Sequence, residues 1–413
     1  MANRQLTADI IASEALLLLD NNFGWLNRIY RAHESEYQSE VNGYKKGATI
    51  SIRRPVDFTV RSGAAVVTQD VIEGKVALTV DQQIGVDFAF TSKDLELNVS
   101  DMAEHILKPA MTNIVNYMGN DLLTQMYRGA YNWVGTAGNT VDSYADFAKA
   151  TQRLDEMAVP MDDRIGLLSP ADHWGMLGSQ TALYMQDVAK GAYRDGSLGR
   201  IAGVDMFMSQ VVPTHTTGTR DATTPLVKGA SQSVTYDTAK DTWTQSLSTD
   251  GHDASVTILA GDVFTIANVY SVNPKTKVST GVLQQFVVTA DVTANATTTT
   301  DSPLVISPPI IISGPHQTVN AAPADDAVIT FNGAASTAYR QNMVLHKNAM
   351  ALAVVPMALP PGAVGGATKS YKGISVRVQP FYDGVNDLSK WRLDLLYGRK
   401  LIDPRTICRL SGT

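Results

Sequence analysis

The sequence predicts an α+β fold in which helical and β segments follow one another and an all-β module interrupts the second half. Three observations predict it. Residues 48–91 alternate apolar and polar side chains, as a strand with one apolar face does. Leu107 to Met126 carries an apolar stripe at helical spacing. From about Thr216 to Tyr339 the chain is rich in Thr, Val, Ser, Ala and Asp, and helical periodicity disappears.

The first two segments are predicted to be a helical arm, residues 1–45, and an extended β-hairpin, residues 46–92. Thr7 is a plausible N-cap for a helix that Gly24 interrupts, with Ile10, Ile11, Leu17 and Leu18 on one face. In the hairpin, one strand alternates at Val56, Phe58 and Val60, and a second at Val76, Leu78, Val80, Val86, Phe88 and Phe90. An isolated two-stranded hairpin is marginal in water, so we expect a neighbouring subunit to cover this one.

A long helix is predicted within residues 93–143. Its stripe consists of Leu107, Met111, Val115, Met118, Leu122 and Met126. A helix from Pro109 to Arg128 would be about 30 Å long. Packing of the stripe against a sheet is favoured over a cofactor or peptide groove, because apolar helix faces are usually buried in this way.

Residues 144–219 are predicted to be a mixed α/β segment. Tyr144 to Ala158 reads as an amphipathic helix, Ile165 to Leu168 as a buried strand and Pro170 to Leu177 as the start of another helix. Three glycines (Gly196, Gly199 and Gly203) then precede an apolar run. Their spacing does not match the G-x-G-x-x-G of a dinucleotide loop, and the following Val204 to Val212 reads as a strand, so we interpret the glycines as turn residues.

An inserted β-barrel or sandwich is predicted for residues 220–341, and the host domain resumes over residues 342–413. The insertion contains five short β-branched runs: Val256 to Leu259, Val263 to Val269, Phe286 to Ala290, Leu304 to Ile306 and Val328 to Phe331. The last predicted strand alternates Trp391, Leu393, Leu395 and Tyr397 with Arg392, Asp394 and Leu396.

Composition restricts the function. The 413 residues are 44% hydrophobic and only 18% charged, and the low charged fraction suggests surface covered by other chains. A net charge of -6 argues against binding nucleic acid by overall charge. The single Cys408 fits a reducing compartment. The apolar run Ala15 to Leu19 is too short to span a membrane, so we expect a soluble protein made in the cytoplasm.

No catalytic, cofactor-binding or metal-binding residues are predicted. The seven histidines are scattered, and none forms H-x-H or H-E-x-x-H. The stretch Gly362 to Ser370, GAVGGATKS, lacks the glycine that a phosphate-binding loop needs before its lysine, because Thr368 stands there. The acidic pairs Asp155-Glu156 and Asp162-Asp163 read as solvated surface carboxylates.

Two stretches resemble a known family. AYRDGSLGRIAGVDMFMSQVVP, residues 192–213, and WRLDLLYGRKLIDPRTICRL, residues 391–410, are similar to the coat proteins of short-tailed Salmonella-type phages. The resemblance implies a Hong Kong 97-like capsid fold. The segments above would then be an N-terminal arm, a long hairpin called the E-loop, a P-domain with a spine helix, an α/β A-domain, and an inserted β-barrel. Residues 342–413 would supply closing strands of the A- and P-domains.

The resemblance further implies a major capsid protein and virion component that self-assembles in the bacterial host cytoplasm. Pentamers and hexamers would form an icosahedral shell on a scaffolding protein, with a portal protein, and the shell would expand as double-stranded DNA enters without sequence specificity. No membrane or cofactor is expected. The expected intersubunit contacts are Arg53, Arg54, Val56, Phe58, Arg61, Glu73 and Lys75. On the arm, Glu14 occupies a loosely matching acidic position for scaffolding contact.

Two other functions stay open at this point. The Thr-rich β module is also compatible with a phage tail or adhesion protein. An enzyme with a β-barrel substrate domain would need a site, which none of the motifs supplies.

Overall fold

A computed structural model describes residues 8–22, 24–32, 40–41, 44–45, 49–66, 68–91, 106–180, 196, 198–220, 224–295, 300–360, 365–371 and 374–413. The chain forms two compact units. The first comprises Met1–Ser51, Ala77–Leu122 and Met350–Lys400, and the second comprises Ile52–Val76, Leu123–Ala349 and Leu401–Thr413.

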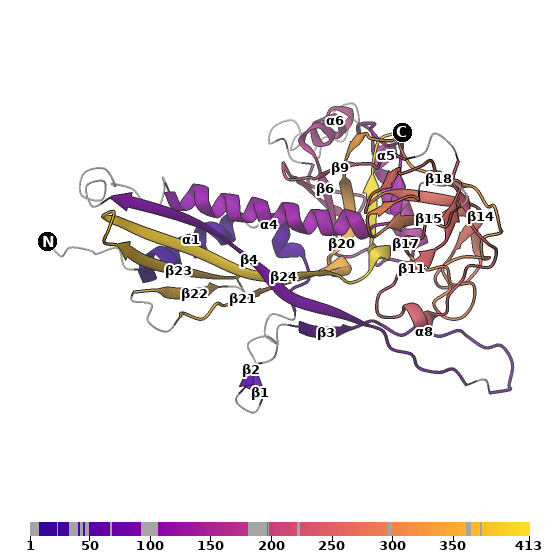
Figure 1. Cartoon of the computed structure of the whole chain (residues 1–413), viewed down its shortest axis with the longest axis horizontal. Coiled ribbons are helices and arrows are strands. Elements are labelled where there is room, and N and C mark those ends of the chain that lie inside the picture. Colours follow the sequence, from indigo (N-terminus) through magenta and orange to yellow (C-terminus); the bar gives the residue numbers. More distant parts are fainter. Residues whose placement is uncertain are drawn as a thin grey trace. The chain divides into compact units, whose positions relative to one another are not determined.

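A long sheet of order β22-β23-β24-β4-β3 dominates the first unit, and β21 also pairs with β24 (Figure 1). The strands are β3 (Thr49–Arg53), β4 (Lys75–Thr91), β21 (Met350–Val355), β22 (Ala367–Tyr371), β23 (Ile374–Asp383) and β24 (Leu388–Leu401). The β4–β24 pairing is antiparallel and runs from Thr91 opposite Leu388 to Val80 opposite Gly398. A two-stranded ladder, β1 (Glu40–Val41) with β2 (Tyr44–Lys45), lies apart from this sheet in the hydrogen-bond pattern.

The arm begins with α1 (Ala8–Asn22), followed by the short 3-10 helix η1 (Gly24–Arg28). The helix and its interruption at Gly24 are as predicted. Helix α1 contacts β22 and β23 of its own chain. Its buried side chains are Ile11, Ala12, Ala15, Leu16 and Leu19. The predicted face is wrong at Leu17, which is exposed, because six residues at 3.6 per turn place it about 120° from Ile11.

The predicted spine helix is confirmed as α4 (Lys108–Gly129), about 33 Å long. All six stripe residues named above are buried. Within the first unit, α4 is tied to β24 through Asp121. The hydroxyl of Tyr397 donates to Asp121 at 2.6 Å, and the Arg399 guanidinium donates at 2.7 Å.

One residue of β24 departs from the predicted alternation. Leu393, Leu395 and Tyr397 are buried as expected, but the intervening Asp394 is buried too. Arg377 Nη2 donates to Asp394 Oδ2 at 2.5 Å, and the Arg392 side chain donates to Oδ1 at 2.8 Å. A buried carboxylate is tolerated when charged donors satisfy it in this way.

The second unit contains a six-stranded sheet of order β5-β25-β20-β6-β8-β7. Its strands are β5 (Asn132–Val134), β6 (Arg164–Leu168), β7 (Arg200–Ile201), β8 (Val204–Met208), β20 (Asn342–His346) and β25 (Ile407–Leu410). Helices α5 (Tyr144–Glu156) and α6 (Pro170–Gln180) share its core, which includes Phe147, Leu154, Leu168 and Met176. Short 3-10 turns lie at η3 (Lys347–Ala349) and η4 (Pro404–Thr406). Helices α5 and α6 and the buried strand β6 were predicted, and the 3-10 turns were not.

The glycine-rich segment is a structural turn, as interpreted. Strands β7 and β8 pair antiparallel through Ala202 (φ 49°) and Gly203 (φ 79°). Two consecutive positive φ angles are typical of the tight turns that join hairpin strands, and glycine adopts them without strain. The predicted strand after Gly203 is confirmed as β8, although it ends at Met208.

The β module (residues 224–331) is built on a five-stranded sheet of order β11-β17-β15-β14-β18. Its strands are β10 (Leu226–Val227), β11 (Gln245–Leu247), β12 (Thr249–Asp250), β13 (Thr257–Ile258), β14 (Val263–Val272), β15 (Ser279–Val288), β16 (Val292–Thr293), β17 (Leu304–Ser307) and β18 (Ile329–Phe331). It also contains α8 (Tyr236–Ala239), a short helix that the composition did not predict. The chain enters the module after β9 (Thr214–Thr216) and leaves it before β19 (Ala338–Arg340), and these two strands pair antiparallel. The domain limits 220 and 341 stay a prediction.

Removing the buried carboxylate of β24 tests how this sheet is held. We expect Asp394→Asn to lower the free energy of unfolding by about 3–5 kcal/mol, because it leaves the Arg377 guanidinium uncompensated. Denaturant unfolding measures the change. The control is Asp81→Asn, an exposed carboxylate 3.9 Å from Arg399, for which we expect about 0.5 kcal/mol or less. Equal effects of the two substitutions would contradict the buried role of Asp394.

Candidate intersubunit surface

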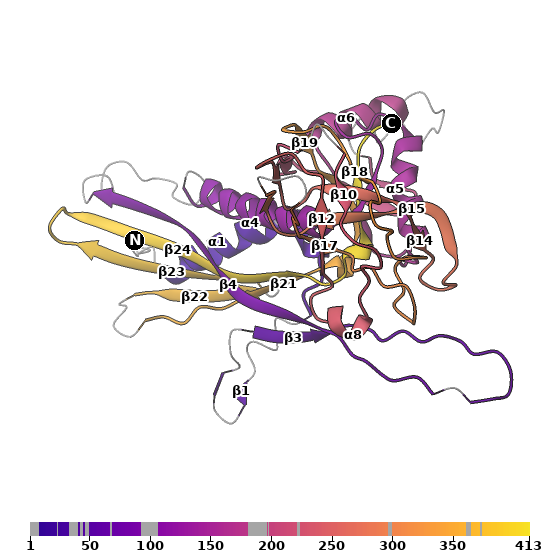
Figure 2. The ribbon, with the colours of Figure 1, turned by 45° about the vertical axis from the view of Figure 1, so that its right-hand side comes forward.

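The extended loop (residues 54–74) joins β3 to β4 and forms no strand over its described residues, all but 67 (Figure 2). The strand predicted at Val56 to Val60 is therefore wrong. Side chains hold the two limbs together instead. The Thr59 amide donates to Gln69 Oε1 at 2.9 Å, and Gln69 Nε2 donates to the Thr59 carbonyl at 2.6 Å. Apolar alternation predicts a strand only where a partner strand exists, and this one has none.

Exposed apolar side chains gather in the loop tip (residues 58–72). The exposed fractions are 53% for Phe58, 97% for Val60, 80% for Val66 and 63% for Val71. On β4, by contrast, Val76 and Leu78 are buried within the chain. The expectation that a neighbour must cover the whole ribbon is therefore wrong for β4, which pairs with β24. Among the described residues of 49–91, the most exposed large apolar side chains lie in the loop tip, whereas Val80, Val86, Phe88 and Phe90 on β4 are half-buried.

The predicted contact residues are spread over the loop. Arg53 and Glu73 form an exposed ion pair at 3.6 Å, a type worth about 0–1 kcal/mol. Arg61 is exposed, and its guanidinium donates to the Gly63 carbonyl. The remaining four divide into exposed Phe58 at the tip, half-buried Val56, and Arg54 and Lys75 at the base. Their role between subunits stays a prediction.

The base of the loop rests on the β module of the same chain. The Arg54 guanidinium lies 5.5 Å from the centre of the Trp243 ring, and Lys277 Nζ lies 3.6 Å from Asp57 Oδ2. On the other limb, the Lys75 amide donates to Asp241 Oδ1 at 2.9 Å. A Cβ at Gly74 would lie only 2.5 Å from the Lys240 carbonyl oxygen. Only glycine permits this close approach.

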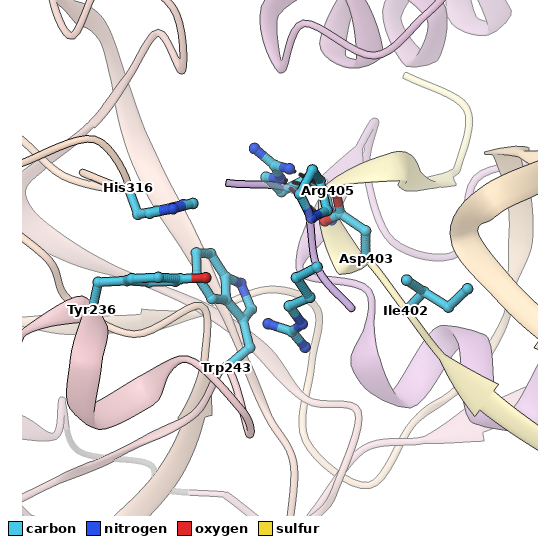
Figure 3. Close-up of a pocket in the computed structure, with 8 residues that line it drawn as sticks. Tyr236, Trp243, His316, Ile402, Asp403 and Arg405 are labelled. Carbon is cyan, nitrogen blue, oxygen red and sulfur yellow. Dashed lines mark hydrogen bonds and ion pairs between the residues drawn. The ribbon is translucent and has the colours of Figure 1, made fainter. Parts of the chain in front are cut away.

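A cavity of about 40 Å³ lies beside this base (Figure 3). Figure 3 shows the Tyr236 and His316 rings face to face, with Trp243 beside them. The centres of the Tyr236 and His316 rings are 3.7 Å apart. Asp403 and Arg405, joined at 2.8 Å, lie across from the rings. The remaining lining residues are Arg54, Pro55 and Ile402. A space of this size holds a water molecule or two and no organic cofactor.

Burial and charge shift the pKa values around the cavity. Burial lowers the pKa of His316 to about 4, and the Arg405 charge adds to that effect. Burial alone would raise the pKa of Asp403, but the charge and hydrogen bonds of Arg405 bring it below its ordinary value. Asp403 in turn raises the pKa of Arg405. The cavity thus contains a neutral histidine next to a charged pair at neutral pH.

A buried carboxylate in the β module binds residues of the segment through which the chain enters the module. Asp262 is fully buried and accepts hydrogen bonds at 2.9 Å from Arg220, 3.2 Å from the Gly218 amide and 3.1 Å from the Leu259 amide. His215 Nε2 lies 2.9 Å from the same carboxylate. Burial opposes ionisation, but the His215 and Arg220 contacts outweigh it and lower the pKa of Asp262.

A buried guanidinium fixes the same junction from the chain's end. Arg409 donates to the Gly261 carbonyl at 2.8 Å and to the Tyr127 carbonyl, and lies over the Tyr127 and Trp133 rings at 5.5 and 5.3 Å. Sequence reasoning missed both Asp262 and Arg409, because a charged residue within a β segment ordinarily faces solvent. No sequence signal distinguishes them.

Two observations concern the described residues that were considered for chemistry. Among the described residues, no three His, Cys, Asp or Glu side chains are grouped to hold a metal ion. Burial raises the pKa of Cys408 to about 12, so its thiol is a core side chain rather than a nucleophile. No described helix has the length and apolarity needed to cross a membrane. Glu14 is exposed on α1, and its scaffolding role stays a prediction.

Comparison with known proteins decides the family. The family model "P22 coat protein - gene protein 5" matches residues 32–412. The chain belongs to the P22 coat protein family. It is also 22% identical over 374 residues to the "Major capsid protein" of Acyrthosiphon pisum secondary endosymbiont phage 1, covering 86% of this chain and 87% of that protein.

The chain is also similar to solved structures of phage proteins. One from Mycobacterium phage Che8 is similar with a TM-score of 0.50 and 13% identity, over 94% of this chain and 92% of that one. The "Asymmetric unit of bacteriophage PhiM1 mature capsid" gives a TM-score of 0.41 and 13% identity, over 89% and 82%. The family match and the likeness to the Che8 structure give this coat protein the α+β, Hong Kong 97-like fold that the resemblance implied. It is a phage major capsid protein and a virion component, and the match favours this over the tail or adhesion alternative.

The histidine in the cavity predicts a pH dependence. Because the pKa of folded His316 lies below the ordinary value of 6.5, the unfolded chain binds its proton more readily. Its neutral form therefore supports the fold above pH 6.5, and this support declines as pH falls toward 4. We expect thermal melts between pH 7 and 4 to show a smaller decline in His316→Phe, which retains a ring to stack on Tyr236. Identical declines in both proteins would contradict this role.

Proposed function

We propose that this coat protein self-assembles into an icosahedral shell of pentamers and hexamers, with the loop tip buried against a second copy. The observation that carries the proposal is the group of exposed apolar side chains at the tip, in a chain of a coat protein family. Several exposed apolar side chains within one short segment commonly mark an interaction site.

Burial of apolar side chains is expected to contribute more free energy to the contact between copies than exposed ion pairs do. Fully burying a Val or Phe side chain contributes about 1.5–3 kcal/mol, whereas an exposed pair such as Arg53–Glu73 contributes about 0–1 kcal/mol. A modest contact repeated around a closed shell sums to a large total stability. Each single contact stays weak enough to permit correction during assembly.

The remaining partners follow from the family. We infer assembly in the bacterial host cytoplasm on a scaffolding protein, with exposed Glu14 of α1 as a candidate contact, and a portal protein at one vertex. The precursor shell would expand as double-stranded DNA enters. The chain would enclose the DNA without sequence-specific binding, and its net charge of -6 gives no overall attraction to the DNA phosphates.

Polar substitutions in the loop tip test the proposal. We expect the double variant Phe58→Ser, Val60→Ser to lower the yield of closed shells at least ten-fold in cells that also produce the phage's scaffolding protein. Sedimentation and electron microscopy measure the yield. Val282→Ser, which removes a comparably exposed apolar side chain (47%) from the β module, is the control. Normal shells from the double variant, with its circular-dichroism melt unchanged, would contradict the proposed contact.

A further inference from the structure

Among the described residues of the extended loop and its flanking strand ends, contacts with the β module occur on both limbs near the base. On the limb that leaves β3, Arg54 lies over Trp243 and Asp57 pairs with Lys277. On the limb that returns to β4, Lys75 bonds to Asp241. The Arg54 amide also donates to the Gly74 carbonyl at 2.8 Å, which joins the limbs to each other. The tip beyond is exposed at Phe58, Val60, Val66 and Val71.

The side chains that receive the loop come from separate parts of the module. Trp243 and Asp241 follow α8, Lys277 lies in the turn between β14 and β15, and His316 lies between β17 and β18. Tyr236 stacks on His316, and its ring meets the Trp243 ring edge-on with centres 6.2 Å apart. The three rings contact one another and come from separate segments of the module. The ring surface that Arg54 contacts therefore forms only when the module is folded.

The junction combines aromatic rings with charged side chains and contains a water-sized cavity. Three nitrogen atoms of the cavity-lining residues have no protein partner: Arg54 Nε, Trp243 Nε1 and His316 Nε2. Buried polar atoms without a protein partner are ordinarily satisfied by ordered water. The junction is made by one cation–ring contact, one partly exposed ion pair and one hydrogen bond, each worth about 2 kcal/mol or less, so it can open at a modest cost in free energy.

We infer that the β module is an intramolecular latch for the extended loop. The module holds both limbs at the base and thereby determines the orientation of the tip. When the Arg54–Trp243 and Asp57–Lys277 contacts open, the loop can change its orientation relative to the module. The closing segment takes part as well, because Ile402, Asp403 and Arg405 line the same cavity. This inference concerns the unassembled chain and does not depend on what the tip contacts.

Hydrogen–deuterium exchange of the unassembled chain tests the latch, and two neighbouring arginines supply a matched pair. We expect Arg54→Gln to speed amide exchange in peptides covering residues 52–60 and 72–78 by roughly three-fold or more, as loss of a cation–ring contact would. Arg53→Gln removes an exposed ion pair with Glu73, worth about 0–1 kcal/mol, and should speed exchange of both peptides less than Arg54→Gln does. Equal exchange in the two variants would overturn the inference.

A charge exchange provides the second arm. Lys277→Glu and Asp57→Lys should each speed exchange of the same peptides, and the double variant should restore the original rate. Lys275→Glu, which makes the same charge change at an exposed lysine of the same turn, should have no effect. Failure of the double variant to restore the rate would overturn the latch. Shell yield is scored separately, so failure of the proposed tip contact is distinguished from failure of the latch.

Discussion

Both limbs of the extended loop rest on the β module, and the tip between them is left without cover from its own chain. Gly74 approaches the Lys240 carbonyl so closely that no other residue fits, and the Lys75 amide is bonded to Asp241. With its base fixed at these points, the loop exposes Phe58 and Val60 to solvent. The cost of leaving that apolar surface in water is the constraint from which the assembly proposal follows.

Buried charges secure the part of the molecule that carries this loop. Asp262 and Arg409 are both buried beside Gly261; the first lies between β13 and β14 of the β module, and the second lies on β25 of the six-stranded sheet. Truncating one partner in such a network leaves an uncompensated charge, which is why these contacts specify geometry more strongly than exposed pairs do. A small apolar cluster that includes Trp133, Val263 and Val287 lies at the same junction.

The spacing of apolar residues predicted those elements in which the same face is buried along the whole length. The α4 stripe is buried throughout, so six apolar residues at helical spacing were sufficient. Prediction failed where contact with a residue or strand distant in the sequence determines whether a side chain is buried or a strand forms. The alternation at Val56 and Phe58 has no partner strand, and Asp394 is buried only because Arg377 reaches it from β23.

The candidate surface was predicted in outline. The sequence placed it in residues 46–92 and named Phe58, but it could not separate the covered strand β4 from the uncovered loop tip. That distinction depends on pairing with β24, which lies some 300 residues further along the chain. The ring cluster at Tyr236, Trp243 and His316 has no spacing signal, because separate segments of the module contribute to it.

Cryo-electron microscopy of particles formed by the expressed protein tests the central claim most directly. The account predicts that the Phe58 and Val60 side chains of each copy are enclosed by residues of a neighbouring copy. A shell in which these side chains face solvent, or fold back onto the body of their own subunit, would contradict it.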